Sequence, residues 1–149
     1  MNKNYGFVQC EGITSITITN DSKYFFTSDS KGCIKQWSIK KKGLHKDYGK
    51  CHGGEIRCIA VTPDSWFFFT SDSRGCLKQW GIKRQMLLCD FGSVHFGEIR
   101  SIAVSGSGLF IFTSDDKGYL KQWEIKRRLL WKDYGKIHRG EIRSVAVSG

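Results

Sequence analysis

One fifteen-residue stretch occurs three times in the chain at a constant spacing. The copies begin at Phe25, Phe68 and Ile111 and read FFTSDSKGCIKQWSI, FFTSDSRGCLKQWGI and IFTSDDKGYLKQWEI. They lie 43 residues apart, with no insertion or deletion between them. A unit of this length cannot bury its own apolar face, so the fixed period predicts units that stack on copies of themselves.

Each period contains four segments with the pattern of β-strands. The first, seen in ITSITIT from Ile13 and IRCIAVT from Ile56, alternates apolar and polar residues, as a strand with two unlike faces does. The second, YFFT, FFFT or FIFT, is apolar on both sides and fits a strand that is covered on both faces. Turns rich in Ser, Asp and Gly separate the segments. Helical periodicity is absent.

We therefore predict an all-β fold: a partial β-propeller of three four-stranded antiparallel blades with partial strands at both ends. Four strands per period, with a Trp near the end of the third, fit the size of a propeller blade. The blades are expected at about residues 13–49, 56–92 and 99–135, and a further blade is expected to start at 142–149. The whole chain, 1–149, is expected to be one repeat domain.

The chain is basic and contains no segment with the character of a membrane span. It has 24 Lys and Arg against 14 Asp and Glu, giving a formal net charge of +10. Such an excess favours anionic partners through its electrostatic field, although it also suits a solvated surface. Neither an apolar run of about 18 residues nor an apolar stretch in the opening MNKNYGFVQCEG is present. We expect a cytoplasmic location, with a nuclear one as the alternative.

The six cysteines show neither a disulfide framework nor a metal pattern. Only Cys33 and Cys76 are equivalent in the repeat, and no CxxC pair exists. Cys51, His52 and Cys58 do not have the spacing of zinc ligands. We expect reduced, partly buried thiols and predict no metal and no cofactor.

With these features the chain resembles the WD-repeat (WD40-type) β-propeller family over nearly its whole length. The features that carry the resemblance are a His near the start of the period at His52, His95 and His138, an apolar strand, a turn such as TPDS at Thr62, a Thr before the hairpin and a Trp that closes the third strand. The resemblance implies a hydrogen-bonded chain of His, Ser or Thr, Asp and Trp within each blade. Carried over residue by residue, this blade network comprises His52, His95, His138, Thr27, Thr70, Thr113, Trp37, Trp80 and Trp123, with Gln9 at the His position of the first copy.

The Asp of the family pattern is missing from its usual position. Six residues before each Trp, where the family places it, stand Lys31, Arg74 and Lys117. An Asp lies two residues earlier in every copy, at Asp29, Asp72 and Asp115. The Asp that follows the Trp is also replaced, by Ser38, Gly81 and Glu124. The fold prediction does not depend on these positions, but the polar network does, and the earlier Asp could complete it only from a shifted turn.

Three complete blades are too few for the closed ring of roughly 4 to 8 blades that propellers form. Left open, the terminal blades would expose apolar faces and strand edges, which favours association. The chain could be a fragment of a longer propeller, an obligate oligomer or an open curved array. We favour the fragment, because the ends cut the repeat at arbitrary places and no polar capping repeat is seen.

Two sets of repeated cations are candidate partner-binding residues. One set lies in the basic turn after each Trp strand and comprises Lys40, Lys41, Lys42, Lys83, Arg84, Lys126, Arg127 and Arg128. The other lies in the second hairpin turns, on the opposite face near the His-bearing loops, and comprises Lys31, Arg74 and Lys117. An arc of cations suits phosphate groups or an acidic protein surface, whereas Lys-rich turns also discourage edge pairing.

Two other features receive structural interpretations. The first strands carry Arg57, Arg100 and Arg143, each two positions after a Glu. We expect each arginine to pair with that Glu rather than to line a channel. Trp66, which has no Trp at its equivalent positions, is expected to pack against the neighbouring strand.

The pattern predicts a binding platform and not an enzyme. Histidines that repeat with the fold indicate a structural role, because an active site needs one constellation and not three copies. Outside the repeat there is no nucleophile elbow, phosphate-binding Gly loop or pair of carboxylates. We predict a non-enzymatic scaffold for protein partners of unknown identity, with self-association through the open ends as a further option. The alternative is an electrostatic binder of RNA, DNA or phosphoinositide headgroups through the basic turns.

Overall fold

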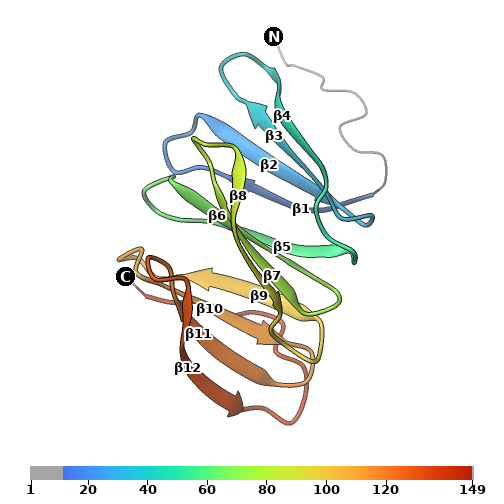
Figure 1. Ribbon diagram of the computed structural model, residues 1–149, viewed down its shortest axis with the longest axis vertical. Coiled ribbons are helices and arrows are strands. Elements are labelled where there is room, and N and C mark those ends of the chain that lie inside the picture. The colour runs from blue at the N-terminus through green and yellow to red at the C-terminus, as the bar shows by residue number, and fades with distance from the viewer. Residues whose placement is uncertain (1–11, 149) are drawn as a thin grey trace.

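The computed structural model describes residues 12–148, whose strands form three separate sheets (Figure 1). The first sheet contains β1 (Ile13–Ile18), β2 (Tyr24–Asp29), β3 (Cys33–Ser38) and β4 (Gly43–Lys50). The second contains β5 (Ile56–Val61), β6 (Phe67–Asp72), β7 (Cys76–Gly81) and β8 (Met86–Ser93). The third contains β9 (Ile99–Val104), β10 (Phe110–Asp115), β11 (Tyr119–Glu124) and β12 (Leu129–Lys136).

Every sheet is an antiparallel meander with its strands in chain order. No helix occurs in the described residues. These observations confirm the predicted all-β fold with three four-stranded antiparallel blades. The partial strand expected at the N-terminal end lies outside the described residues, and residues 137–148 contain no strand.

The hairpin between the second and third strands of each sheet is fixed by an Asp and a Gly. In the second sheet, Oδ1 of Asp72 accepts hydrogen bonds from the backbone N–H of Arg74 and of Cys76, both at 2.9 Å. Gly75 follows with a φ of +79°, and a Cβ at this position would collide with the carbonyl oxygen of His95. A Gly is required here for its conformation and for the space it leaves.

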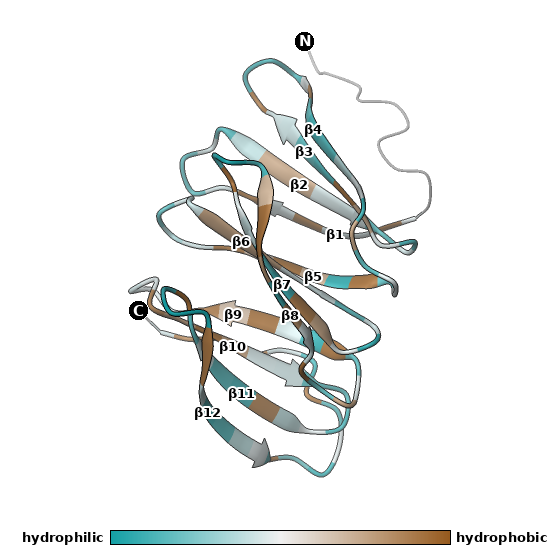
Figure 2. Ribbon diagram, viewed as in Figure 1, coloured by the Kyte–Doolittle hydropathy of each residue, from teal (hydrophilic) through white to brown (hydrophobic). Residues whose placement is uncertain are grey.

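The hydrophobic core lies between the sheets. The first cluster joins the first two sheets and contains Phe26, Ile34, Ile56, Ile59, Phe68, Trp80 and Ile82. The second joins the last two sheets and contains Phe69, Leu77, Ile99, Ile102, Ile111, Trp123 and Ile125. The neighbours Phe68 and Phe69 on β6 thus face opposite clusters, which explains why this strand is apolar on both sides. Figure 2 shows the apolar segments concentrated on inner strands such as β5 and β9.

The meander places alternate turns at opposite ends of each sheet. The inner strands β1, β5 and β9 lie side by side, so equivalent turns of the three sheets share an end (Figure 1). One end carries residues 19–23 and 39–42 with their equivalents in the other sheets, and we call it the basic-turn end. The opposite end carries the hairpin turns at 30–32, 73–75 and 116–118 and the connections between sheets, and we call it the histidine end.

Among residues 12–148, no other sheet packs on the outer face of the first sheet or of the third. Ile16 on β1 is 63% exposed, whereas its equivalents Ile59 and Ile102 are 6% and 7% exposed. Beyond β12, the chain turns back along the third sheet, and the N–H of Ile142 donates to the carbonyl of Asp115 at 3.1 Å. Ile142 is buried as its equivalents Ile56 and Ile99 are. The segment after β12 therefore packs on the third sheet where the first strand of a further sheet would lie, but it forms no strand itself.

Candidate functional site: polar networks and two basic surfaces

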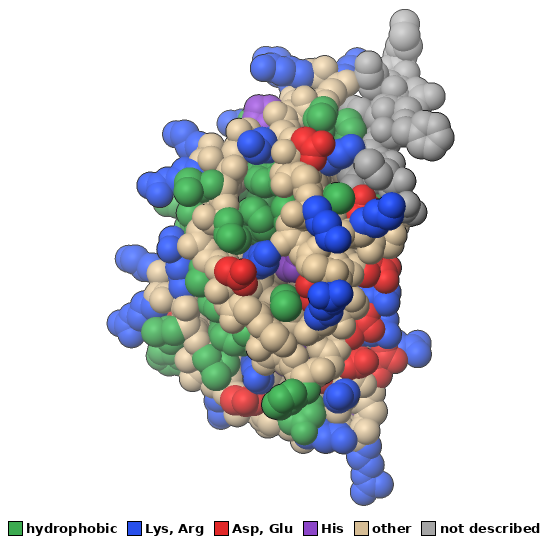
Figure 3. Space-filling view, turned by 45° about the vertical axis from the view of Figure 1, so that its right-hand side comes forward, with side chains coloured by type: hydrophobic (Ala, Val, Ile, Leu, Met, Phe, Trp, Pro, Cys, Tyr) green, Lys and Arg blue, Asp and Glu red, His purple; other side chains and the backbone are tan. Residues whose placement is uncertain are grey.

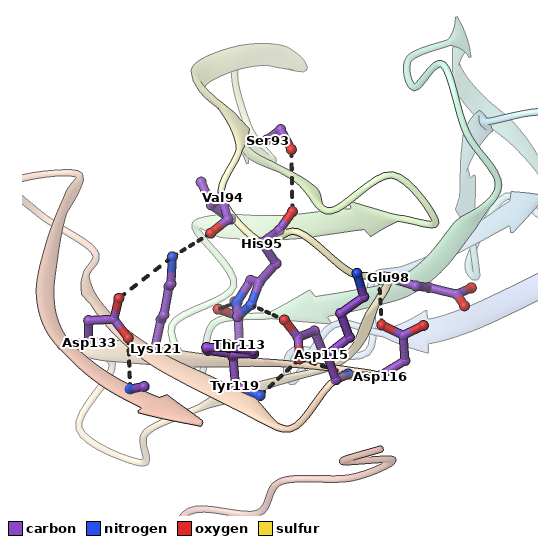
Figure 4. A network of polar contacts seen from close by, with 12 residues as sticks. Ser93, Val94, His95, Glu98, Thr113, Asp115, Asp116, Tyr119, Lys121 and Asp133 are labelled. Carbon is purple, nitrogen blue, oxygen red and sulfur yellow. Dashed lines mark hydrogen bonds and ion pairs between the residues drawn. The ribbon is translucent and has the colours of Figure 1, made fainter. Parts of the chain in front are cut away.

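A buried polar network connects each of the last two sheets to the segment that enters it. Figure 4 shows the network around His95 in the third sheet. In the third sheet, the indole Nε1–H of Trp123 donates to Oγ1 of Thr113 at 2.9 Å. The Thr113 hydroxyl lies 2.8 Å from Nε2 of His95, and Nδ1 of the same ring lies 2.9 Å from Oδ2 of Asp115. Since an indole N–H can only donate, the Thr113 hydroxyl accepts that hydrogen bond and can donate its own O–H to Nε2 of His95. Nδ1–H of the ring then donates to the Asp115 carboxylate.

The second sheet repeats this arrangement with the same geometry. His52 lies 2.6 Å from Oγ1 of Thr70 and 3.0 Å from Oδ2 of Asp72, and Trp80 donates to Thr70 at 2.9 Å. In the first sheet Trp37 donates to Thr27 at 3.0 Å, and Gln9 lies outside the described residues.

His138 differs from the other two histidines. It follows the third sheet as His95 follows the second, but its side chain is exposed. By its place in the repeat, His138 would contact the Thr and Asp of a fourth sheet, and the described residues contain no fourth sheet. The structure therefore brings two of the three predicted histidines into a network.

The Asp in these networks is the one two residues before the family position. Oδ1 of Asp115 accepts the N–H of Lys117 at 3.0 Å and of Tyr119 at 2.9 Å, which leaves Oδ2 for the ring of His95. One carboxylate thus holds both the hairpin and the histidine. Repetition of an Asp at this position in all three copies was the sequence signal for the role, and the lysines and arginine at the family position point outward instead.

The protonation states in these networks follow from burial and from the partners. Burial lowers the pKa of His95, although Asp115 acts in the opposite direction. Burial alone would raise the pKa of Asp72, but hydrogen bonds from His52 and from two backbone N–H groups outweigh it and lower that pKa. His95 is only 4% exposed and both ring nitrogens have partners. The ring is thereby suited to fixing the connection between sheets and not to exchanging protons with a substrate.

An alternating series of charges runs along the first strands. Its members in order are Glu55, Arg57, Glu98, Arg100, Glu141 and Arg143. Arg100 lies 3.1 Å from Glu98, which directly precedes its strand, and 2.9 Å from Glu141 of the next repeat. Arg57 likewise contacts both Glu55 and Glu98. The predicted pairing within each repeat is thus accompanied by pairing between repeats. The last member, Arg143, pairs only with Glu141 among the described residues and is 84% exposed.

The repeated cations of the histidine end are presented at the hairpin tips. Lys31, Arg74 and Lys117 are all exposed, and the N–H of each donates to the network Asp two residues earlier at 2.9 to 3.0 Å. One such cation therefore stands on each sheet in the same local geometry.

The cations of the basic turns lie at the other end of the sheets. All of them are exposed, and Figure 3 shows Lys and Arg side chains along the left-hand edge of the molecule. A pocket of about 400 Å³ opens at this end of the second sheet, between the turn that contains Trp66 and the turn that contains Lys83 and Arg84. Trp66 is 68% exposed, so the expectation that it packs against the neighbouring strand is wrong.

The thiols in the described residues are free, and the pKa values of several of them are raised by burial. Burial raises the pKa of Cys51 to about 12 and also raises the pKa of Cys58. No group of three or more His, Cys, Asp or Glu in the described residues is placed to hold a metal ion. No helix long and apolar enough to cross a membrane is found in that part of the chain.

The repeated geometry agrees with comparisons to known proteins. The sequence profile of the family described as WD domain, G-beta repeat, matches residues 5–38 and 89–124. The solved structure titled "Crystal structure of RRP9 WD40 repeats" superimposes on 94% of the chain with a TM-score of 0.88 at 14% identity. Two stretches of the chain match the WD40 repeat profile, and the described residues have the fold of WD40 propeller blades. The structure titled "Structure of U3-55K" gives the same TM-score, identity and coverage of this chain.

The chain spans less than half the length of those two proteins, 43% of the first and 44% of the second. No curated protein sequence matches the chain. The likeness at 14% identity establishes the fold, and the partners of the two proteins are not transferred to this chain.

The fold also uses residues that the sequence did not single out. Nζ of Lys121 on β11 donates to the carbonyl of Val94 at 2.5 Å and lies 3.8 Å from Asp133. Lys78 makes the equivalent contacts with the carbonyl of Cys51 and with Asp90. The lysines of the second and third KQW motifs thus connect the third strand of their sheet to the segment that leaves the preceding sheet. Their recurrence was visible in the sequence, but their partner carbonyls were not.

Proposed function

We propose that this chain is a non-enzymatic platform on which protein partners dock through the cations of the histidine end. The observation that supports this proposal is the presence of Lys31, Arg74 and Lys117 in three hairpin turns of the same construction. Each turn is fixed by hydrogen bonds to an Asp carboxylate before a partner arrives. A preorganised set of contacts loses little conformational entropy on binding and so converts more of its interaction energy into affinity.

The partner that best fits these turns is an acidic protein segment. Three cations at one end of adjacent sheets can each meet a carboxylate of a single extended chain. The net charge of +10 adds a field that raises the rate of encounter with such a partner. The buried histidines support a non-enzymatic role, because two equal copies are each occupied by hydrogen bonds within the fold.

The open faces of the first and third sheets are additional candidate contacts. Each presents apolar side chains that are buried at the equivalent positions between sheets, as Ile16 and Ile59 illustrate. Further blades of a longer protein, or a second copy of this chain, would cover such faces. Either occupant leaves the turns at the histidine end accessible.

A charge-reversal experiment tests the proposal. The variant Lys31→Glu, Arg74→Glu, Lys117→Glu is compared with the matched variant Lys40→Glu, Lys83→Glu, Lys126→Glu, which makes the same number of charge changes at the basic-turn end. Partners are recovered quantitatively from one cell extract, and the most enriched partner is then purified and its Kd for each variant is measured.

We expect the first variant to bind this partner at least tenfold more weakly and the second to bind it within about twofold of the wild-type affinity. Only the first variant removes cations that the bound partner would shield from water. Circular dichroism and thermal unfolding establish that both variants are folded. Wild-type affinity in the first variant would contradict the proposed docking surface.

A further inference from the structure

The pocket at the basic-turn end combines an exposed indole with three cations. It is lined by residues of the second sheet, which include Trp66, Phe67, Lys83, Arg84 and Leu88, and by Arg128 of the third. The indole stands against Phe67, with ring centroids 6.5 Å apart and an interplanar angle of 70°. The Trp66 ring makes this edge contact while 68% of the residue stays exposed. The volume of about 400 Å³ lies within the usual range for small-ligand pockets.

Gly81 leaves the cations of this pocket without a neutralising carboxylate. Its equivalents in the first and third sheets are Ser38 and Glu124, and Oε1 of Glu124 lies 3.6 Å from Nε of Arg127. A Cβ at Gly81 would sit 3.3 Å from Cδ1 of Leu88 and 3.6 Å from Cβ of Arg84, at the wall of the pocket. Within residues 12–148, neither Lys83, Arg84 nor Arg128 forms an ion pair.

Arg128 brings the third cation from the neighbouring sheet. It ends the basic turn of the third sheet with a φ of +57°, and its Nη1 donates to the carbonyl of Leu88 at 3.4 Å. The contact holds the guanidinium over the second sheet and beside Lys83 and Arg84. The pocket therefore exists only when two consecutive sheets are stacked.

A similar hollow of about 380 Å³ at the first sheet provides an internal comparison. It is lined by Lys40 and Lys41 but has Lys23 where the second sheet has Trp66. The first hollow has Tyr24 at the position of Phe67 but no indole, whereas the second adds the exposed ring of Trp66 to its cations. The third sheet has Leu109 at the same position.

We propose that this pocket binds single-stranded nucleic acid, with one base stacked on Trp66 and the adjoining phosphates on Lys83, Arg84 and Arg128. Nucleotides carry a flat ring and an anion within a few bonds of each other and repeat both along a chain. The basic turns of the first and third sheets continue the cationic surface on either side, where a polyanion can follow it. An inositol phosphate headgroup has no flat apolar group for the indole. The site is at the opposite end from the proposed protein-docking turns, so the two proposals stand or fall separately.

Fluorescence anisotropy with two labelled twelve-nucleotide probes tests this inference. One probe is oligouridylate and the other is an abasic strand of the same length, which keeps the phosphates and lacks the bases. We expect Trp66→Leu, which introduces the residue of the third repeat, to weaken oligouridylate binding by roughly 5- to 150-fold, the range given by base–aromatic stacking. The same change should alter abasic binding by less than about twofold.

A second variant and a matched control complete the experiment. Gly81→Glu places the residue of the third repeat in the pocket and should weaken binding of both probes at least tenfold, by filling the site and pairing the cations. Phe96→Leu removes another exposed aromatic ring, 94% exposed at the histidine end, and should leave both affinities within about twofold. Parallel titrations with oligothymidylate identify RNA or DNA as the preferred source of the base.

Three results would overturn the proposal. Equal binding of the oligouridylate and abasic probes would show a diffuse attraction to polyanions. An unchanged affinity of the Trp66→Leu variant for oligouridylate would show that no base stacks on Trp66. Tight binding of vesicles with phosphoinositide, together with no measurable binding of either oligonucleotide, would assign the pocket to a lipid headgroup.

Discussion

The second sheet lacks a tyrosine hydroxyl that makes a side-chain hydrogen bond in each of its two neighbours. Oε1 of Gln36 accepts a hydrogen bond from the hydroxyl of Tyr48 at 3.0 Å, and Gln122 and Tyr134 form the same pair at 2.9 Å. The second sheet has Phe91 at this position, and Oε1 of the buried Gln79 has no hydrogen-bond partner. An unsatisfied buried acceptor of this kind costs about 1–3 kcal/mol.

Replacing Phe91 by Tyr should therefore stabilise the protein. We expect the free energy of unfolding to rise by about 1 kcal/mol, because the new hydroxyl can donate to Gln79 as its equivalents do. Urea unfolding followed by Trp fluorescence measures the change. Tyr48→Phe is the reciprocal control and should lower the free energy of unfolding by a similar amount. A Phe91→Tyr protein of unchanged or reduced stability would show that the amide is satisfied in another way.

At this scale the sequence predicted positions better than contacts. The repeated Thr and Trp were identified because both recur with the fold, and the structure places Thr113 and Trp123 in contact. The role of Asp115 was only partly visible, because it depends on the course of the hairpin after β10. Exposure of Trp66 could not be foreseen, since it follows from a turn that projects beyond the stacked faces.

The strands contribute to stability as a connected set. Arg100 on β9 contacts Glu98, which directly precedes this strand, and Glu141 of the following segment, and its side chain is 34% exposed. The charges on the inner strands therefore join successive repeats in addition to the apolar clusters. Partial exposure limits the strength of each pair through screening by water and salt.

The substitution Arg100→Met should weaken this connection in a salt-dependent way. We expect a loss of about 1 kcal/mol in the free energy of unfolding at low salt and roughly half of that at 0.5 M salt, since screening already reduces the wild-type pairs. Urea unfolding at the two salt concentrations gives both values. Arg143→Met is the matched control: with 84% exposure and one partner, it should change the free energy by less than about 0.5 kcal/mol. A loss that is independent of salt would assign the role of Arg100 to packing of its stem.

The arrangement of elements was the most predictable level. The apolar second strand and the period of two in the first strand predicted that each sheet packs one face on the preceding sheet and the other on the following sheet. Phe68 and Phe69 on β6 make these two contacts. The segment after β12 was less predictable. Val145 N–H donates to the hydroxyl of Ser101 at 3.1 Å, yet residues 137–148 form no strand without a second strand beyond them.

The whole molecule has two unlike apolar faces at the ends of its stack. On β1, Ile13, Ile16 and Ile18 are 50%, 63% and 59% exposed, and at the other end Tyr134 and Ile137 are 39% and 46% exposed. Between sheets, equivalent residues from one face pack against equivalent residues from the other. The two faces of one molecule therefore have the complementary shapes of a head-to-tail contact.

We expect the isolated chain to associate as its concentration rises. Light scattering behind a sizing column, over about a hundredfold range of concentration, should show a mass that grows above that of the monomer. Ile16→Lys introduces a charge into the open face and should shift the onset of association to higher concentration, whereas the exposed Leu44→Lys on β4 should not. A monomer at every concentration would mean that the end faces are satisfied within a single chain.

A chain built from equal units presents equal surfaces, and a polymeric ligand could engage them in frames that differ by one repeat. Such degeneracy blurs the position of the ligand, however tightly it binds. Trp66 and Gly81 occur together in one copy alone. Two substitutions in an otherwise regular array are enough to select one frame, so the site of recognition is defined by where the copies differ from one another.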